Sequence, residues 1–257
     1  MTALLRHPLR VTGRLLWLGG DIVLFLLSYV VTVALRRGGP HITARTRWLQ
    51  ASSRRTLRIL GLRIHTEGPI PTQGLIVSNH LSYLDVLVLS SITPVVFVAK
   101  SEVARWPIFG WFARLAGTLF VRRSHRADVV RLNREIVDLF AGGVPIVLFP
   151  EGTSSDGRRV LPFKSSLLEP ARQLNPPLYA ALIDYEVTEG VTSREVCYWG
   201  DMTLLPHLIN LLSKRGVRAS VSLKTVAPSL TSRKALARQL HAQVSSLRQG
   251  ATSGMPA

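Results

Sequence analysis

Short apolar runs rich in β-branched residues alternate along the chain with stretches of helical periodicity. The runs that predict strands are residues 75–78, 95–99, 118–121, 145–149, 178–183, 195–198 and 217–223. The stretches that predict helices are residues 83–90, 103–116, 127–140, 165–173, 202–212 and 236–247. Such alternation is typical of an α/β domain, and we expect a central mixed sheet flanked by helices.

The N-terminal pattern is different, because residues 15–35 form one nearly continuous apolar stretch of 21 residues. A bilayer span needs about 20 apolar residues, but Gly19, Gly20 and Asp21 interrupt the stretch and leave 14 unbroken ones. Arginines flank both ends, which favours both ends on the cytoplasmic face. We therefore expect a segment that dips into the membrane and returns or lies in one leaflet, and a single span stays open as the alternative.

Residues 46–60 have helical spacing of apolar positions, with arginines between them. This pattern is typical of a helix at a membrane surface and equally of an ordinary helix packed on the domain. We expect a membrane-associated helical segment over residues 1–60, a catalytic domain over residues 61–247 and a disordered tail over residues 248–257.

The charge balance restricts the partners. Lys and Arg number 32 against 15 Asp and Glu, a formal net charge of +17, which attracts nucleic acid or an anionic membrane. Hydrophobic residues make up 47% and the mean hydropathy is +0.23, and both favour the membrane. No zinc-finger or RNP-type signature supports nucleic-acid binding. The single cysteine, Cys197, cannot form an internal disulfide, and we expect it to pack in the core.

The first candidate for chemistry is the segment from Asn79 to Asp85, which follows an apolar run. His80 can take a proton near neutral pH, and a carboxylate such as Asp85 can orient the ring. Five residues turn an ideal helix by roughly 500°, so the two side chains can meet only if His80 lies in the turn before the helix. Asp85 also fits a helix-capping pattern with Ser82, which is a structural alternative for its role.

The second candidate follows a predicted buried strand and reads Phe149-Pro150-Glu151-Gly152-Thr153. Its proline and glycine indicate a tight loop. In this order, H-x4-D and F-P-E-G-T resemble the motifs of the glycerolipid acyltransferases of the 1-acylglycerol-3-phosphate acyltransferase type. A third block, residues 117–123, is similar to the family's G-x-x-F-[IV]-x-R pattern. The resemblance covers roughly residues 45–225.

The resemblance implies a role for each matched residue. His80 would be the general base for a substrate hydroxyl, and Asp85 would orient it. The residues implied in binding the acceptor and its phosphate are Arg123, Glu151, Gly152, Thr153, Lys100 and Lys164. No nucleophile elbow G-x-S-x-G is present, in agreement with a nucleophile that belongs to the substrate. No metal-ligand spacing occurs, and we expect neither metal nor cofactor.

The sequence departs from the family pattern at the phosphate end of the site. Ser154 stands where family members commonly have arginine, and Ser166 takes the glycine position of an F-K-x-G element. Residues 178–183 keep a strand but lack the usual proline. We expect Arg158, Arg159 or Lys164 to supply the missing charge.

The resemblance implies acyl transfer from acyl-CoA or acyl carrier protein to 1-acylglycerol 3-phosphate (lysophosphatidic acid). The product would be phosphatidic acid, a step of phospholipid biosynthesis at the cytoplasmic face of the inner or plasma membrane. Another lysolipid, such as lyso-ornithine lipid or a lysophospholipid, is the alternative acceptor. A non-catalytic membrane-binding protein on the same scaffold is the alternative of another class.

Overall fold

The computed structural model describes residues 7–35, 41–122, 125–227 and 231–253. Seven strands form one sheet in the order β1-β7-β6-β2-β5-β3-β4. The strands are β1 (Leu62–Glu67), β2 (Leu75–Ser78), β3 (Val96–Lys100), β4 (Leu119–Val121), β5 (Ile146–Leu148), β6 (Leu178–Val187) and β7 (Val217–Val226). All neighbouring pairs are parallel except β6 with β7. The sheet is therefore mixed, as expected.

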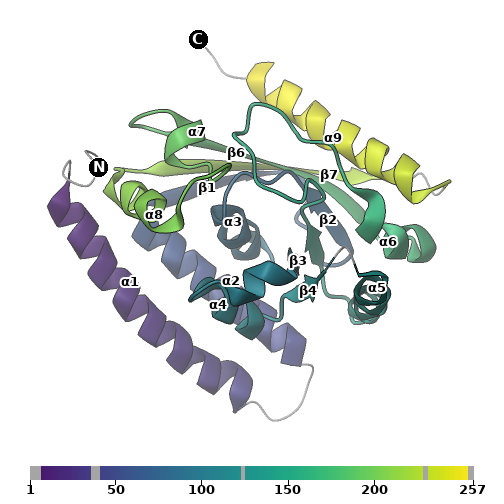
Figure 1. Ribbon diagram of the computed structural model, residues 1–257, viewed down its shortest axis with the longest axis horizontal. Coiled ribbons are helices and arrows are strands. Elements are labelled where there is room, and N and C mark those ends of the chain that lie inside the picture. The colour runs from purple at the N-terminus through teal and green to yellow at the C-terminus, as the bar shows by residue number, and fades with distance from the viewer. Residues whose placement is uncertain (1–6, 36–40, 123–124, 228–230, 254–257) are drawn as a thin grey trace.

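Helices cover both faces of the sheet (Figure 1). They are α1 (Pro8–Tyr29), α2 (His41–Leu60), α3 (Leu84–Ile92), α4 (Phe109–Leu115), α5 (Arg126–Ala141), α6 (Glu169–Leu174), α7 (Thr192–Glu195), α8 (Leu204–Ser213) and α9 (Arg233–Ser253). A π-helical turn, η2 (Val30–Ala34), continues α1, and two 3-10 turns, η3 (Ser101–Arg105) and η4 (Ser165–Leu167), precede α4 and α6.

Alternating side chains of the strands feed two apolar cores. On β2, Ile76 belongs to the core beneath α1, α2, α3 and α8, whereas Leu75 and Val77 belong to the core beneath α5, α6 and α9. This alternation follows from the period of two along a strand. A central strand buried on both faces is consistent with the uniformly apolar runs of the sequence.

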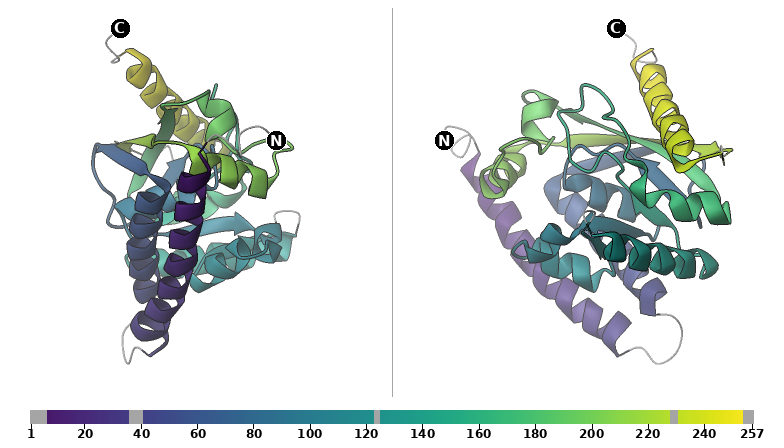
Figure 2. Two further views of the ribbon diagram at one scale, coloured as in Figure 1. Left: turned by 90° about the vertical axis from the view of Figure 1, so that its left-hand side faces the viewer. Right: turned by 45° about the vertical axis from the view of Figure 1, so that its right-hand side comes forward.

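The two N-terminal helices lie side by side on one flank of the molecule (Figure 2). The buried face of α2 includes Leu49, Leu57 and Leu60, so this helix packs on the domain. Asp21, the charge that interrupts the apolar stretch, is only 9% exposed and binds Arg55 Nε and Thr56 Oγ1 of α2, both at 2.8 Å. Asp21 therefore links α1 to α2 through its hydrogen bonds with Arg55 and Thr56.

Several expected elements need correction. Residues 195–198 do not form a strand, because α7 ends at Glu195 and Cys197 packs from an irregular segment. The expected helix 103–116 is broken between Arg105 and Phe109. Strand β1 was missed, because as an edge strand it buries only alternate residues. The last helix continues to Ser253, inside the expected disordered tail.

Candidate active site

His80 lies in the turn between β2 and α3, the position that the helix geometry required. Its Nδ1 lies 2.7 Å from Asp85 Oδ2. Because an ionised carboxylate can only accept, Nδ1 carries the hydrogen and Nε2 keeps its lone pair. The His80 side chain is 23% exposed and that of Asp85 is 0% exposed. Nε2 of the partly exposed ring is therefore available to accept a proton, while the buried Asp85 carboxylate holds Nδ1.

The Asp85 carboxylate accepts four hydrogen bonds. Oδ2 also accepts from the backbone N–H groups of Leu81 at 2.6 Å and Ser82 at 3.0 Å. Oδ1 accepts from Tyr185 Oη at 2.7 Å. Asp85 thus satisfies the turn before α3 and holds His80 at once, whereas Ser82 Oγ, buried, has no hydrogen-bond partner among the described residues and caps nothing there. A fixed carboxylate of this kind stabilises the imidazolium formed when His80 takes a proton.

Strand β6 supplies two of the supports that the sequence did not reveal. Asn79 bridges the backbone of Ile183, accepting from its N–H at 2.8 Å and donating to its carbonyl at 2.9 Å. Two residues further, Tyr185 reaches Asp85. Burial and the Asp85 charge raise the pKa of Tyr185 well above its ordinary value, so the phenol keeps its proton and remains a donor. Tyr185 carries no local motif, because its role depends on the pairing of β2 with β6.

The F-P-E-G-T loop closes over the same turn. In the parallel pair β2–β5, Val77 lies opposite Leu148, so the two motifs leave the sheet side by side at its carboxyl edge. The Phe149 ring stacks on His80 with 4.2 Å between centroids and an interplanar angle of 20°. Ser155 N–H donates to the His80 carbonyl at 3.0 Å. Gly152 has φ of +74°, a conformation that favours glycine.

Glu151 is 3% exposed and only half satisfied. Oε1 accepts from Leu161 N–H at 3.1 Å, and Oε2 is buried with no partner among the described residues. Burial raises the pKa of Glu151 to about 8, against hydrogen bonds that favour the carboxylate, and the nearby Asp85 charge adds to the rise. Near neutral pH Glu151 is mostly protonated, and it can donate or accept one further hydrogen bond.

The other expected site residues lie further out. Lys100, at the end of β3, and Thr153 and Lys164 are exposed. Lys164 adjoins the Glu151 loop, since its N–H donates to the Pro150 carbonyl at 2.9 Å. Arg123 lies outside the described residues. In the described part of the chain, no hydrogen bond or ion pair joins the side chains of Lys100, Thr153 or Lys164 to His80, Asp85 or Glu151.

Two of the basic residues expected to replace the missing arginine differ in their contacts. Both Arg158 and Arg159 are exposed. Arg158 forms an ion pair with Asp156, with Nε and Oδ2 3.2 Å apart.

Cys197 is buried, and burial raises the pKa of its thiol to about 12, so it packs in the core and stays protonated. Across the described ranges, no three His, Cys, Asp or Glu side chains group as metal ligands would.

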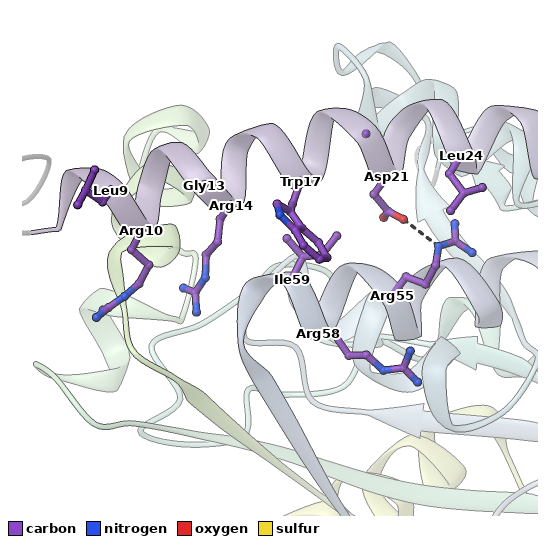
Figure 3. Close-up of a pocket in the computed structure, with 11 residues that line it drawn as sticks. Leu9, Arg10, Gly13, Arg14, Trp17, Asp21, Leu24, Arg55, Arg58 and Ile59 are labelled. Carbon is purple, nitrogen blue, oxygen red and sulfur yellow. Dashed lines mark hydrogen bonds and ion pairs between the residues drawn. The ribbon is translucent and has the colours of Figure 1, made fainter.

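A groove of about 840 Å³ lies between α1 and α2, apart from these residues. Arg10 and Arg14 from α1 and Arg55 and Arg58 from α2 surround it, together with Trp17 and Asp21 (Figure 3). Asp21 is paired with Arg55, whereas Arg10 and Arg14 donate to carbonyls at the end of α8. The lining of the groove contains no histidine, and its one carboxylate, Asp21, is bound by Arg55 and Thr56.

Comparison with known proteins decides the family. A family model described as acyltransferase matches residues 61–184. The chain is 38% identical over 214 residues to a lyso-ornithine lipid O-acyltransferase of Brucella abortus, covering 77% of this chain and 80% of the relative. The chain belongs to the acyltransferase family. A 1-acyl-sn-glycerol-3-phosphate acyltransferase of Neisseria gonorrhoeae is 30% identical, covering 67% of this chain and 68% of the relative.

The fold of this acyltransferase matches that of a solved relative. The crystal structure of the 1-acyl-sn-glycerophosphate acyltransferase PlsC from Thermotoga maritima superposes with a TM-score of 0.73 over 98% of each chain, at 19% identity. The match confirms the α/β fold with a mixed sheet. Helix α1 with η2, Pro8–Ala34, is long and apolar enough to cross a membrane. Together with the lipid-acylating relatives, it indicates membrane association of the acyltransferase.

Proposed function

We propose that this acyltransferase moves a fatty acyl group from acyl-CoA or acyl carrier protein to the free hydroxyl of a lysolipid. The observation that carries the proposal is the pair His80–Asp85. Its 2.7 Å hydrogen bond fixes Nδ1 as the donor and leaves Nε2 as the base. A hydroxyl is a weak nucleophile until a base takes its proton, and this step contributes typically about 10²–10⁴-fold to the rate.

The reaction then proceeds without a protein nucleophile. His80 Nε2 takes the hydroxyl proton as the oxygen attacks the thioester carbonyl. A new C–O bond forms, and the carbonyl electrons move to oxygen in a tetrahedral intermediate. When the C–S bond breaks, the thiolate leaves and takes the proton from the imidazolium, which regenerates neutral His80. Asp85, whose four hydrogen bonds prevent it from moving, stabilises the transient charge of the ring.

We expect Glu151 to bind the acceptor. Its unpartnered Oε2 lies in the loop whose Phe149 stacks on His80, so an acceptor hydroxyl at this atom would lie near the base. The loop residues Gly152 and Thr153 would bind the headgroup. Lys100 and Lys164, exposed at the same edge of the sheet, would attract an anionic headgroup, and Arg123 would do so by its family position.

Two acceptors are supported. The relatives named as lyso-ornithine lipid O-acyltransferases are 34–38% identical to the chain, against 30% for the 1-acyl-sn-glycerol-3-phosphate acyltransferases of Neisseria. Ser154 replaces the arginine of the phosphate-binding pattern. Since ornithine contains no phosphate, this replacement costs less with a lyso-ornithine lipid. Both observations favour lyso-ornithine lipid, with 1-acylglycerol 3-phosphate as the second candidate.

We place the enzyme on the cytoplasmic face of the membrane, with residues 1–60 in contact with lipid. The outer side of α1 exposes large apolar side chains, among them Leu16 at 72% and Leu27 at 60%. Such exposure is unfavourable in water and favourable in a lipid leaflet. The arginines around the groove between α1 and α2 suit anionic headgroups beside that leaflet (Figure 3).

An acceptor panel tests the proposal. Purified enzyme would receive labelled acyl-CoA or acyl carrier protein with lyso-ornithine lipid, 1-acylglycerol 3-phosphate or other lysophospholipids, and labelled diacyl product would be measured. We expect the highest kcat/KM with lyso-ornithine lipid. A preference for 1-acylglycerol 3-phosphate would assign the second candidate. Absence of product with every acceptor, from protein that binds vesicles, would instead indicate a non-catalytic membrane-binding protein.

A further inference from the structure

The connection between η3 and α4, together with the first turn of α4, exposes a group of large apolar side chains outside the helical hairpin. Trp106 is 39% exposed, Ile108 58% and Trp111 48%. We call residues 106–111 the insertion loop. An isolated exposed apolar residue is ordinary, but three within six positions form a patch of the kind that marks an interaction site. The patch was not anticipated, because the sequence pattern predicted one continuous helix there.

The backbone of the insertion loop is strained in a way that exposes Ile108. Ile108 has φ of 64° and ψ of −59°, and the Phe109 N–H donates to the Pro107 carbonyl at 2.6 Å. These values define the rarer, strained form of γ-turn. A β-branched residue is an outlier at positive φ, and in water its exposure brings no compensating burial. Strained residues of this kind cluster at functional sites.

The loop is held rigidly. A Cβ at Gly110 would lie 2.5 Å from the Ala104 carbonyl oxygen and 2.6 Å from that of Val103. Only glycine therefore allows α4 to begin against η3. The Gly110 N–H also donates to the Trp106 carbonyl at 3.0 Å. The exposed side chains are thus presented by a fixed turn.

The position of the loop connects the membrane-facing helix with the active site. Behind it, the Phe112 ring packs edge-on against Phe25 of α1 with 4.5 Å between centroids, and α4 lies between α1 and α5 (Figure 1). On its inner side, Phe109 packs against Tyr83, with centroids 5.8 Å apart. Tyr83 is three residues from His80 in sequence. The loop therefore extends the apolar surface of α1 toward the His80 turn.

The charges around the loop suit an anionic bilayer surface. Lys100, Arg105 and Arg114 are exposed and form no ion pair within the described part of the chain, against one acidic residue, Glu102. Tryptophan prefers the membrane interface, and cationic side chains at the edge of an inserted surface reach the headgroups. We propose that the insertion loop enters the headgroup region of an anionic phospholipid bilayer as a second membrane contact beside α1. The proposal rests on the membrane association proposed above and deepens it.

Fluorescence quenching measures the insertion directly. The full chain would be reconstituted into phosphatidylcholine–phosphatidylglycerol vesicles with brominated acyl chains, and tryptophan emission compared with unbrominated vesicles. The test variant is W106F/W111F, which keeps aromatic character. The matched control is W199F, because Trp199 is 38% exposed outside the loop. Removing two of three lipid-facing tryptophans should lower the quenched fraction by about half, whereas W199F should raise it. An unchanged fraction in W106F/W111F would overturn the proposal.

A second variant separates insertion from folding. Ile108→Gly suits the positive φ and removes the apolar side chain, so the protein should keep or raise its melting temperature in detergent. We expect the apparent KM for a lysolipid embedded in vesicles to rise about fivefold, with kcat/KM for the same lysolipid in detergent micelles unchanged. An equal KM in vesicles would contradict the proposal. Lack of any acylation by the wild type would refute the proposed function alone, because the quenching result does not depend on turnover.

Discussion

The His80 turn and the apolar surface of α1 and the insertion loop depart from the usual burial of residues in opposite ways. At the turn, polar groups are buried: Asp85 and Asn79 are 0% and 1% exposed. On the outer side of α1 and in the insertion loop, large apolar groups are exposed, with Leu16 at 72% and Ile108 at 58%. Buried polar groups and exposed apolar patches are the informative exceptions in a folded protein.

The two regions also differ in how their unfavourable groups are compensated. Asp85 is satisfied within the chain by four donors, so the turn is complete before substrate arrives. The exposed apolar groups are not covered by any of the described residues, and under the proposal above lipid would cover them. The fold therefore organises the His80 turn, while the proposed membrane contact would set its location.

The largest expected effect is at the turn. His80→Ala removes the base, and we expect kcat to fall by about 10²–10⁴-fold, with vesicle binding unchanged and the melting temperature lowered because Asp85 loses one of its four donors. Acyl transfer by purified protein gives the measurement. His65→Ala is the control, because His65 is a largely exposed histidine on β1 whose side chain pairs with Glu67. Near-wild-type turnover of His80→Ala would refute the assignment of the base.

Tyr185→Phe tests whether the support from β6 matters to the base. Removing a hydrogen bond to a charged group costs about 1.5–3 kcal/mol, and we expect the free energy of unfolding to fall by that amount. We also expect kcat to fall roughly tenfold with KM unchanged, because Asp85 loses the donor that holds its carboxylate beside His80. Tyr179→Phe, on the same strand, is the control. Loss of stability with an unchanged kcat would make Tyr185 purely structural.

Glu151→Gln tests the burial of Glu151 through the pH dependence of the free energy of unfolding. The pKa of Glu151 is about 8 in the folded protein, raised from 4.5 by burial. Because the folded state holds this proton more tightly, the Glu151 contribution to stability is largest below pH 4.5 and is lost as the pH rises to 8. Glutamine does not titrate, so the variant should gain on the order of 1 kcal/mol or more relative to wild type between pH 5 and 8.5. Urea unfolding across that range measures it, and parallel curves would contradict the burial argument.

The smallest expected effect belongs to the membrane side. Arg58 is exposed beside the groove, with no carboxylate partner in the described part of the chain. One arginine near an anionic surface contributes about 1 kcal/mol, so Arg58→Gln should weaken binding to phosphatidylglycerol vesicles about fivefold in low salt. Arg63→Gln, on edge strand β1, is the charge-matched control. An equal loss in both variants would show that net charge alone attracts the membrane.

Much of this molecule follows from local pattern. The apolar runs predicted six of the seven strands, because a sheet covered on both faces buries every residue of its central strands. The sequence pattern does not predict β1, because an edge strand buries only alternate residues and therefore has no continuous apolar run. The geometry of His80 and Asp85 followed from helix rotation and one capping pattern, since both residues belong to a single turn of chain.

Other features depended on contacts between distant segments. Tyr185 is 100 residues from Asp85 in sequence, and the stacking of Phe149 on His80 joins two motifs through the pairing of β2 with β5. The sequence of its loop does not predict that Glu151 has one bonded and one unbonded carboxyl oxygen, because burial depends on the distant segments that pack around it. The break at Pro107 and the strained Ile108 likewise depend on how α4 meets η3.

The motifs of the sequence by themselves predicted an acyltransferase, because they resemble those of that family, and the relatives confirm the family. The charge and the apolar N-terminus, which are properties of composition, predicted membrane association. Only the tertiary structure decided which groups hold His80 and Asp85, how deeply Glu151 is buried and which loop exposes its apolar side chains. The physical reason is that hydrogen bonding, burial and exposure arise between segments, whereas motif and periodicity lie within them.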